Sequence, residues 1–330
     1  MKKGRIPDIV ICITARVGSE RQRFKAIADV GGQPLIHHIA KRLDEAGKVI
    51  IATSTRPEND ILEEWAKGEN RPVYRHPIEE DVVGRVVAAV DEFYPNAQLI
   101  MRGLCDCPFH HPAFIKRAGE CIWQHEADAF SWALPPDTWP IYGTREFPLS
   151  RHAWDIINQN ARKEERMHTD MYYHRHRDKF SIVYHEPPPS LYFREHYRVE
   201  VDYPEDLELL RGLYSHFGYY PTLDETIKFL DTDNRLWRIN RFREEKTGMI
   251  VSFRHDERIK WWKEMIGHPI VMWDDSVWQM PESGKPIFCR AKKCLLGYAV
   301  DGKLYQNGAV ISGSALLHCA CGAGYKWSHS

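Results

Sequence analysis

The sequence predicts an α/β fold, in which a mostly parallel sheet is sandwiched by helices, followed by a small β-rich domain. Between residues 8 and 103, short apolar runs alternate with segments of helical periodicity, which is typical of parallel sheets with helical crossovers. Charged turns follow the first and the last of these runs, and such sheets bind ligands beyond the carboxyl ends of their strands. From about residue 269 the pattern changes to short β-like runs separated by glycines.

The alternation assigns each element in order. Strands are expected at 8–15, 48–54, 71–76 and 97–103, and helices at 34–47, 58–68 and about 80–94. In the first helix, an apolar face suited to packing against a sheet is formed by Leu35, Ile36, Ile39 and Leu43. Two Pro-rich loops, 134–148 and 185–196, flank a helix-like stretch rich in histidine at 166–180. A further strand is expected from residue 197, and a helix starts at Pro204, because proline favours the first helical turn.

We divide the 330 residues into three parts. Residues 1–220 form the main domain, 221–268 a helical, basic and aromatic connector, and 269–330 the small β-rich domain. A formal net charge of −1 excludes a protein that coats nucleic acid or an anionic membrane with its whole surface. No apolar run approaches the roughly 18–20 residues that span a bilayer, and the first residues lack a signal-peptide cleavage site. We therefore expect a cytoplasmic protein without a membrane partner.

A cationic turn, "ARVGSERQRFK" (residues 15–25), follows the first apolar run. Its cations, Arg16, Arg21, Arg23 and Lys25, repel one another unless an anion lies among them. Gly18 and Ser19 let backbone N–H groups approach phosphate oxygens, so the turn suits a polyphosphate. A solvated loop is the alternative, because blocks of charge are often merely solvated.

Two aspartates come after apolar runs, and each precedes a proline by two residues: Asp106 and Asp202. Carboxylates at neighbouring strand ends form an all-oxygen site that suits Mg²⁺ bound to substrate phosphates. Either aspartate taken alone is explained better by capping of the helix that follows. Together with the cationic turn, the pair favours phosphoryl or nucleotidyl transfer, which depends on positioning and charge neutralisation.

Several segments resemble the cytidylyltransferase group that includes CMP-sugar-acid synthetases and spore-coat polysaccharide biosynthesis (SpsF-type) proteins. They occur in the same order as in that group, across residues 8–215: "ARVGSERQRFKAIADVGGQPLIHHIAKRL", "IATSTRPENDIL", "EEDVVGRVVAAV", "MRGLCDCPFHHP", "RMHTDMYY" and "YRVEVDYPEDLELL". The resemblance implies a Rossmann-like sheet of the nucleotidyltransferase (GT-A) type. It also implies attack by an acceptor oxygen on the α-phosphorus of CTP, or of another nucleoside triphosphate, with pyrophosphate leaving.

The resemblance also implies roles for individual residues. Arg16 and Lys25 match basic residues that hold the triphosphate and act in catalysis, and Asp106 and Asp202 match the catalytic carboxylates that bind Mg²⁺. The nucleotide is expected to contact Ala15, Arg16, Gly18, Ser19, Arg21, Lys25, Asp81 and Arg85. A small sugar-like or anionic acceptor is expected to contact Gly143, Glu146, Arg166 and His168. Enzymes of this group are often homodimers, so a dimer is also expected.

Two positions depart from the pattern of the group. Phe24 precedes the lysine of the first loop and Cys105 precedes Asp106, where the group usually has glycine. Both changes narrow the room for close approach of the backbone to a ligand.

Four of the eight cysteines lie near the C-terminal end: Cys289, Cys294, Cys319 and Cys321. Two thiolate pairs separated by β-like sequence are typical of a structural, zinc-ribbon-like Zn²⁺ site. Unligated cysteines are the alternative, and His318 is a substitute ligand. The remaining cysteines lie in apolar surroundings, where a thiol usually acts as a small hydrophobe.

Two other functions stay open. A glycosyltransferase of similar fold would use a nucleotide sugar, but such enzymes bind metal through Asp-x-Asp, and this chain has Cys-Asp-Cys at 105–107. A non-catalytic binding protein would act through the basic and aromatic stretch 235–263 and the zinc-ribbon-like domain. An amphipathic connector explains that stretch better, so nucleic acid is not expected as a partner.

Overall fold

The computed structural model describes residues 4–18, 21–133, 147–186, 188, 197–232, 235–240 and 268–279, and six short strands between 285 and 327. The chain divides into two compact units. The first comprises Met1–Phe130, Gly143–Ile182 and Arg198–Arg241, and the second comprises Ser131–Tyr142, Val183–Tyr197 and Phe242–Ser330.

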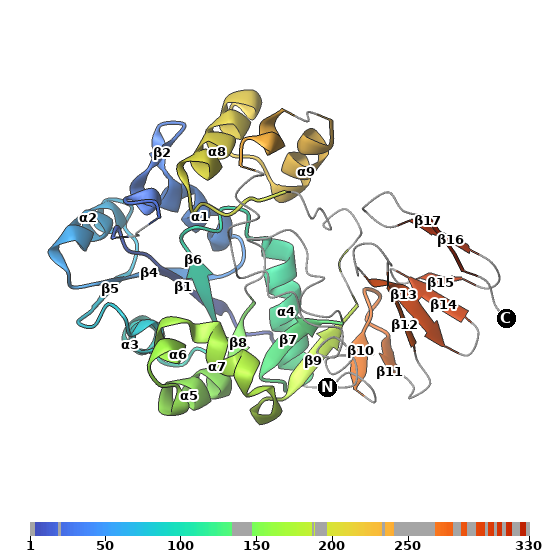
Figure 1. Ribbon diagram of the computed structural model, residues 1–330. Coiled ribbons are helices and arrows are strands. Elements are labelled where there is room, and N and C mark those ends of the chain that lie inside the picture. Colours follow the sequence, from blue (N-terminus) through green and yellow to red (C-terminus); the bar gives the residue numbers. More distant parts are fainter. Residues whose placement is uncertain are drawn as a thin grey trace. The chain divides into compact units, whose positions relative to one another are not determined.

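The first unit is built on a mostly parallel sheet (Figure 1). Its strands follow the order β7-β8-β6-β1-β4-β5. Their bounds are β7 Ala129–Trp132, β8 Leu149–Ser150, β6 Leu99–Leu104, β1 Ile9–Thr14, β4 Lys48–Ser54 and β5 Val73–His76. Strand β1 is parallel to both β4 and β6, and β4 is parallel to β5. The two-residue β8 is antiparallel to β6 and β7. The predicted fold class is therefore confirmed.

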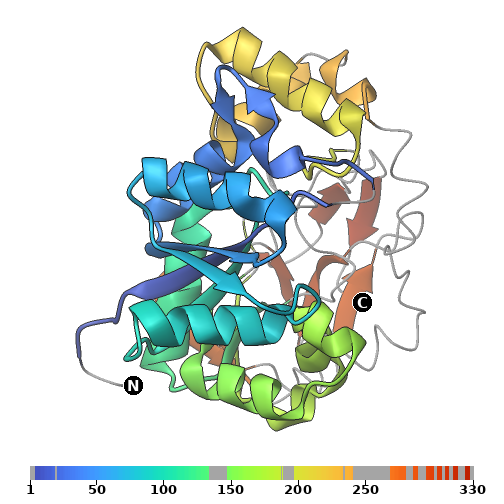
Figure 2. The same ribbon diagram turned by 90° about the vertical axis from the view of Figure 1, so that its left-hand side faces the viewer.

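Helices cover both faces of this sheet because side chains alternate along each strand. On one face, Val10 and Cys12 of β1 pack with Val86 of α3 (Val82–Phe93) and Trp154 of α5 (Arg151–Asn160). The opposite face is covered by α1 (Leu35–Asp44) and α4 (Pro112–Gln124), whose Gly119 lies against Ile9. Figure 2 shows the same arrangement from the side, with α2 (Asp60–Gly68) and α3 on opposite sides of the strands.

Every strand and helix that the alternating pattern predicts between residues 8 and 94 is present, with ends shifted by a few residues. The strand expected from residue 197 is wrong, because within 197–202 only Arg198 takes part in a β-bridge. This segment is instead fixed by a hydrogen bond from Val201 N–H to the carbonyl oxygen of Asp106, at 2.8 Å. Helix α8 (Pro204–Phe217) then starts at Pro204, as expected.

The first of the following elements, a hairpin, was not predicted, whereas the helices lie in segments that were expected to be helical. A two-residue hairpin joins β2 (Asp29–Val30) to β3 (Gln33–Pro34), and α9 (Leu223–Thr232) follows α8. The histidine-rich stretch forms two short helices, α6 (Glu164–Met167) and α7 (Thr169–Arg175), and a 3-10 turn, Arg177–Lys179. Most of the basic connector, residues 241–267, lies outside the described residues.

The second unit is rich in β-structure. Strand β10 (Pro269–Val271) is parallel to β9 (Ile182–His185) and antiparallel to β11 (Val277–Gln279). A four-stranded antiparallel sheet contains β12 (Lys285–Phe288), β13 (Leu295–Val300), β14 (Lys303–Gln306) and β15 (Ala309–Ile311). Strands β16 (Ala315–His318) and β17 (Gly324–Trp327) form a hairpin. The four clustered cysteines lie outside the described residues.

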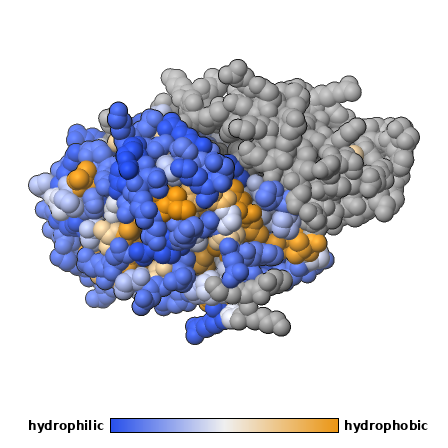
Figure 3. Space-filling view, turned by 90° about the horizontal axis from the view of Figure 1, so that it is seen from below, coloured by the Kyte–Doolittle hydropathy of each residue, from blue (hydrophilic) through white to orange (hydrophobic). Residues whose placement is uncertain are grey.

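The described part of the surface is largely hydrophilic on the face seen in Figure 3, with hydrophobic residues in smaller groups. Within the described segments, the helices lack the combination of length and apolar character that a bilayer crossing needs.

Candidate functional site

The candidate site lies where β1 and β6 end. These strands are parallel neighbours, with Thr14 opposite Leu104, so the residues that follow them emerge at the same edge of the sheet. Asp106 follows β6 by two residues. The chain returns to this edge through a 3-10 turn, Lys25–Ile27, and through the segment that precedes α8. Three distant parts of the sequence therefore meet here.

Lys25 occupies the centre of the site. Its Nζ lies 2.7 Å from Asp106 Oδ2 and 3.1 Å from Asp202 Oδ1, and it donates to the carbonyl oxygen of Val201 at 3.0 Å. The Lys25 side chain is almost fully buried. Burial by itself lowers the pKa of Lys25, but the nearby carboxylates outweigh it and the pKa is raised, so the ammonium stays charged. The two predicted aspartates thus lie within reach of one cation, and that cation is Lys25.

Asp202 has further cationic partners. Its Oδ1 is 2.8 Å from Arg21 Nη2, and its Oδ2 accepts from Arg198 Nη2 at 3.0 Å. Asp206 fixes the same segment, because it accepts from Arg198 Nε at 3.0 Å and from the Asp202 amide at 2.8 Å. Both oxygens of Asp202 are therefore committed to basic side chains.

A second carboxylate beside Asp106 was missed in the sequence. One potential ligand atom each from Asp106, Cys107 and Glu200 lie within 4.8 Å of one another. Burial, followed by the charges of Asp106 and Asp202, raises the pKa of Glu200 well above its usual value. Two carboxylates at this spacing fit a hard divalent cation, which prefers oxygen ligands. The available signal was the short spacing of Glu200 from Asp202, which the sequence already placed at the site.

The first half of the cationic turn is attached to the neighbouring strand β4 and to the connection between β4 and α2. Ala15 N–H donates to the Ala52 carbonyl oxygen and Val17 N–H to Asn59 Oδ1, both at 3.0 Å. The Arg16 side chain is 46% exposed, and its Nη1 lies 3.3 Å from Glu79 Oε1. Arg16 therefore stands at the rim of the site, half in solvent, while Lys25 is inside.

Asp81 and Arg85 lie at the start of α3. Asp81 caps this helix by accepting from Gly84 N–H at 2.9 Å, and it also pairs with Arg166 at 2.7 Å. Arg85 is 2% exposed and donates to the carbonyl oxygen of Glu79. The pairing of Asp81 with Arg166 joins the segment expected near the nucleotide to the segment expected near the acceptor. His168 lies between α6 and α7.

Arg102 is a further residue that the sequence reading missed. It lies on β6, where Nε donates to Thr14 Oγ1 at 3.1 Å and Nη1 to Thr169 Oγ1 at 3.3 Å. This side chain links the end of β1 to the start of α7.

The remaining residues that were expected to contact the nucleotide or the acceptor are less informative. Gly18 is exposed, and Ser19, Gly143 and Glu146 lie outside the described residues.

The two departures from the family pattern have structural consequences. Phe24 has φ 58° and ψ 18°, a left-handed conformation that glycine adopts more easily. Cys105 is buried, and burial is the main cause that raises the pKa of its thiol to about 11. It therefore stays protonated beside Asp106.

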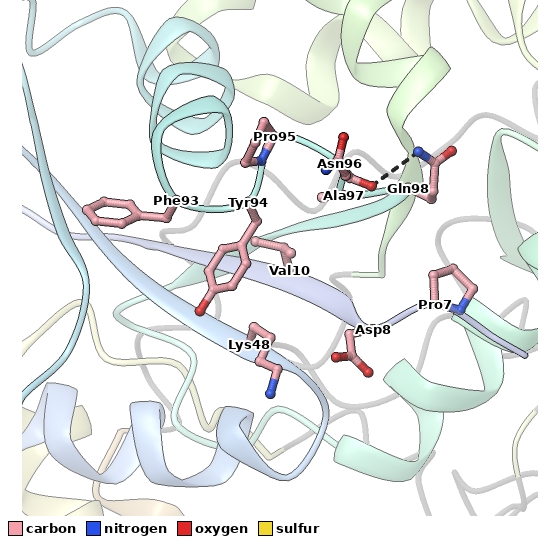
Figure 4. Close-up of a pocket in the computed structure, with 10 residues that line it drawn as sticks. All are labelled: Pro7, Asp8, Val10, Lys48, Phe93, Tyr94, Pro95, Asn96, Ala97 and Gln98. Atoms are coloured by element: carbon pink, nitrogen blue, oxygen red, sulfur yellow. Dashed lines mark hydrogen bonds between the residues drawn. The ribbon is translucent and has the colours of Figure 1, made fainter.

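A hollow of about 360 Å³ lies at the other edge of the sheet (Figure 4). It is lined by residues at the start of strands, among them Asp8 before β1, Lys48 of β4 and Gln98 before β6. Since the cationic turn and the carboxylates lie at the opposite strand ends, this hollow is separate from the candidate site.

Fold and site together define an α/β enzyme of the nucleotidyltransferase class. The family model for cytidylyltransferases matches residues 10–250, and the chain belongs to this family. The resemblance seen in the sequence is thereby confirmed.

Individual relatives agree with this assignment. The chain is 26% identical over 223 residues to the spore coat polysaccharide biosynthesis protein SpsF of Bacillus subtilis, covering 65% of this chain and 89% of that protein. It is 26% identical over 136 residues to the 3-deoxy-manno-octulosonate cytidylyltransferase of Polynucleobacter necessarius, covering 41% of this chain and 53% of that protein. A cytidylyltransferase structure from Leptospira borgpetersenii superposes with a TM-score of 0.61 at 20% identity, covering 70% and 96% of the two chains. At this identity the likeness concerns the fold.

Proposed function

We propose that the protein transfers CMP from CTP to a small anionic, sugar-like acceptor and releases pyrophosphate, with Mg²⁺ as cofactor. The observation that carries the proposal is the buried Lys25 ammonium between Asp106 and Asp202, at the strand ends of a cytidylyltransferase-family sheet. A sugar-acid acceptor is supported by the match to a 3-deoxy-manno-octulosonate cytidylyltransferase.

In this proposal the chain's basic residues bind the triphosphate. Arg16 and Arg21 are each about half exposed at the rim, so both are accessible to an incoming anion. Lys25 lies deeper and is already charged, so it is placed to neutralise phosphate oxygens without a change of protonation. A divalent cation held by the carboxylates supplies further neutralisation of the phosphates.

The chemical step makes one bond and breaks one. An acceptor oxygen attacks the α-phosphorus of CTP and passes its proton to solvent water, and the bond from that phosphorus to the bridging oxygen of the β-phosphate breaks. Because the leaving pyrophosphate takes that electron pair, the cations at the site stabilise the charge that develops on it. Asp81 holds Arg166 beside the start of α3, and in this proposal Arg166 positions the acceptor.

The test is pyrophosphate release, measured with each of the four common nucleoside triphosphates against sugar acids, sugar phosphates and phosphonates. We expect CTP with a sugar acid to give the highest rate. We expect Lys25→Met to lower the rate by about 10²-fold or more, as for the loss of a group that stabilises developing charge. Lys116→Met, at an exposed position of α4, is the matched control and should leave the rate unchanged.

Two results would count against this function. Pyrophosphate release that survives Asp106→Asn unchanged would remove the role of the carboxylates. Transfer of sugar from a nucleotide sugar, with no pyrophosphate produced, would support the glycosyltransferase alternative.

A further inference from the structure

Glu79 is a buried carboxylate in the loop between β5 and α3, and the sequence pattern did not indicate it. Its side chain is 3% exposed. Burying a carboxylate is costly unless donors satisfy both of its oxygens. In the described part of the chain, Oε2 accepts from Ser54 Oγ at 2.8 Å and from Asn59 Nδ2 at 3.2 Å, and Oε1 lies 3.3 Å from Arg16 Nη1 and 3.4 Å from Arg56 Nη1. Four side chains from two other parts of the sequence therefore converge on Glu79.

The two oxygens of Glu79 have different kinds of partner. Oε2 binds neutral, buried side chains, Ser54 at the end of β4 and Asn59 directly before α2. Oε1 binds two guanidinium groups, those of Arg16 and Arg56, whose side chains are each about half exposed. Burial by itself raises the pKa of Glu79, but the hydrogen bonds that it accepts outweigh burial and lower the pKa, so the carboxylate is charged at neutral pH. One oxygen is thus tied to the interior of the fold, and the other holds cations at the surface.

Arg16 is held through its side chain and through the backbone that follows it. The Val17 amide donates to Asn59 Oδ1 at 3.0 Å, and Asn59 is fully buried, so the chain after Arg16 is fixed. Asn59 in turn donates to Ser54 Oγ at 2.7 Å and to Glu79. A free arginine side chain has many rotamers, and ordering them when an anion binds costs conformational entropy. An ion pair that already restricts Arg16 in the free protein reduces that cost.

We propose that Glu79 is a positioning residue for nucleotide binding, which holds the Arg16 guanidinium at the rim of the site in place for the triphosphate of CTP. The inference rests on the proposed function for the role of Arg16. Glu79 itself is buried, so it acts through Arg16 and not by contact with the nucleotide. Loss of the Glu79 charge should therefore weaken CTP binding only in a protein that still has Arg16.

The test measures the Kd of CTP for the full chain by isothermal titration calorimetry, with Mg²⁺ and without an acceptor. In Glu79→Gln the amide oxygen can still accept the two hydrogen bonds made to Oε2, whereas its NH₂ group faces two guanidinium groups and holds neither. We expect this variant to bind CTP about three- to tenfold more weakly, the fold-change for ordering one flexible side chain. Glu80→Gln is the matched control and should leave the Kd unchanged, because the half-exposed Glu80 pairs with Arg56 at 2.7 Å rather than with Arg16.

A double-mutant cycle separates positioning from a structural role. Arg16→Met removes the group through which Glu79 acts, so Glu79→Gln should weaken CTP binding little further in that background. Glu79→Asp keeps the charge but withdraws it from Arg16 by one methylene, and it takes the place of Glu79→Gln, with the same expectation, if that variant does not fold. Equal losses in both backgrounds, or normal CTP binding without the Glu79–Arg16 pair, would overturn the proposal, and so would a parent protein that binds no CTP.

Pyrophosphate release distinguishes this proposal from the proposed function. Normal CTP binding by Glu79→Gln, in a protein that releases pyrophosphate, would refute the positioning role and leave the proposed function intact. A loss of CTP binding that depends on Arg16, in a protein that releases no pyrophosphate, would do the reverse.

Discussion

Arg166 donates to both carboxylate oxygens of Asp81, through Nε at 2.7 Å and Nη2 at 3.0 Å, although the two residues are 85 positions apart. Asp81 also caps α3 through the Gly84 amide. One carboxylate therefore fixes the start of α3 and ties α6 to it. We infer that the segments expected near the nucleotide and near the acceptor form one rigid wall of the site.

Replacing Asp81 tests this link through stability and its pH dependence. Burial by itself raises the pKa of Asp81, but the hydrogen bonds from Arg166 and the Gly84 amide outweigh it, so the folded-state pKa lies below the usual value. The stabilisation is then fully present above the unfolded pKa of about 4 and is lost as pH falls below it. We expect Asp81→Asn to lower the free energy of unfolding by about 2 kcal/mol at neutral pH, measured by urea unfolding. In acid the difference between Asp81→Asn and the parent protein should become smaller.

A double-mutant cycle separates the ion pair from the cap. Arg166→Gln should be destabilising in the parent protein and nearly neutral in the Asp81→Asn background, since its partner is already weakened. Additive effects of the two substitutions would show that the pair contributes nothing to folding.

The hairpin between β2 and β3 offers a test at two adjacent glycines. Gly31 and Gly32 have φ 65° and 84°, as the turn of a two-residue hairpin requires. A Cβ at Gly31 would overlap the ring of Tyr214 on α8, whereas a Cβ at Gly32 would meet no atom within 4 Å. Gly31→Ala should therefore cost about 1–3 kcal/mol more than Gly32→Ala in unfolding experiments.

The two glycine substitutions also test the candidate site, because α8 begins at Pro204, two residues after Asp202. Gly31→Ala displaces either the hairpin or α8, so we expect it also to raise the KM for CTP, with Gly32→Ala as the control. Equal effects of the two substitutions on stability would mean that the hairpin does not pack on α8 as described.

The sequence predicted the structure correctly where a single physical rule determines the secondary structure. Apolar runs of strand length predicted β1, β4 and β6. Buried parallel strands have such runs because helices cover both faces of the sheet. Strand ends then placed Asp106 near the cationic turn. The meeting of Asp202 with Lys25, 177 positions apart, was suggested by the family pattern and could not come from periodicity.

The misses have physical causes. The apolar residues at 197, 199 and 201 alternate as in a strand, but they are buried in an irregular segment that is held by Asp206 and Asn240. Strand β8 has two residues, too few for any period to show. Glu200 was overlooked because proximity to Asp106 depends on this irregular segment.

Phe24 offers a test of backbone strain in the cationic turn. Its left-handed conformation costs about 1–2 kcal/mol for a residue with a side chain, and the residue is 49% exposed, so burial offsets little of that cost. Asparagine tolerates this conformation, whereas a β-branched residue does so poorly. We expect Phe24→Asn to be at least as stable as the parent protein and Phe24→Val to be less stable by about 1 kcal/mol or more. Since the two replacements are similar in size, equal stabilities would show that this conformation is not retained.

The clustered cysteines give a prediction about metal content. The sequence predicts one structural Zn²⁺ held by Cys289, Cys294, Cys319 and Cys321, which lie outside the described residues. Two buried cysteines of the first unit, Cys12 and Cys105, are less suited to zinc, because burial is the main cause that raises the pKa of each thiol and zinc requires thiolates.

We therefore expect about one zinc per chain by mass spectrometry of the purified protein. Cys289→Ser or Cys319→Ser should lower this content and destabilise the C-terminal β-structure, because binding energy at a structural zinc site contributes directly to folding. Cys121→Ser, at a buried thiol of α4, is the matched control and should retain the zinc. Zinc content that falls with Cys121→Ser and not with Cys289→Ser would place the metal in the first unit, and protein without zinc would leave the four cysteines as unligated thiols.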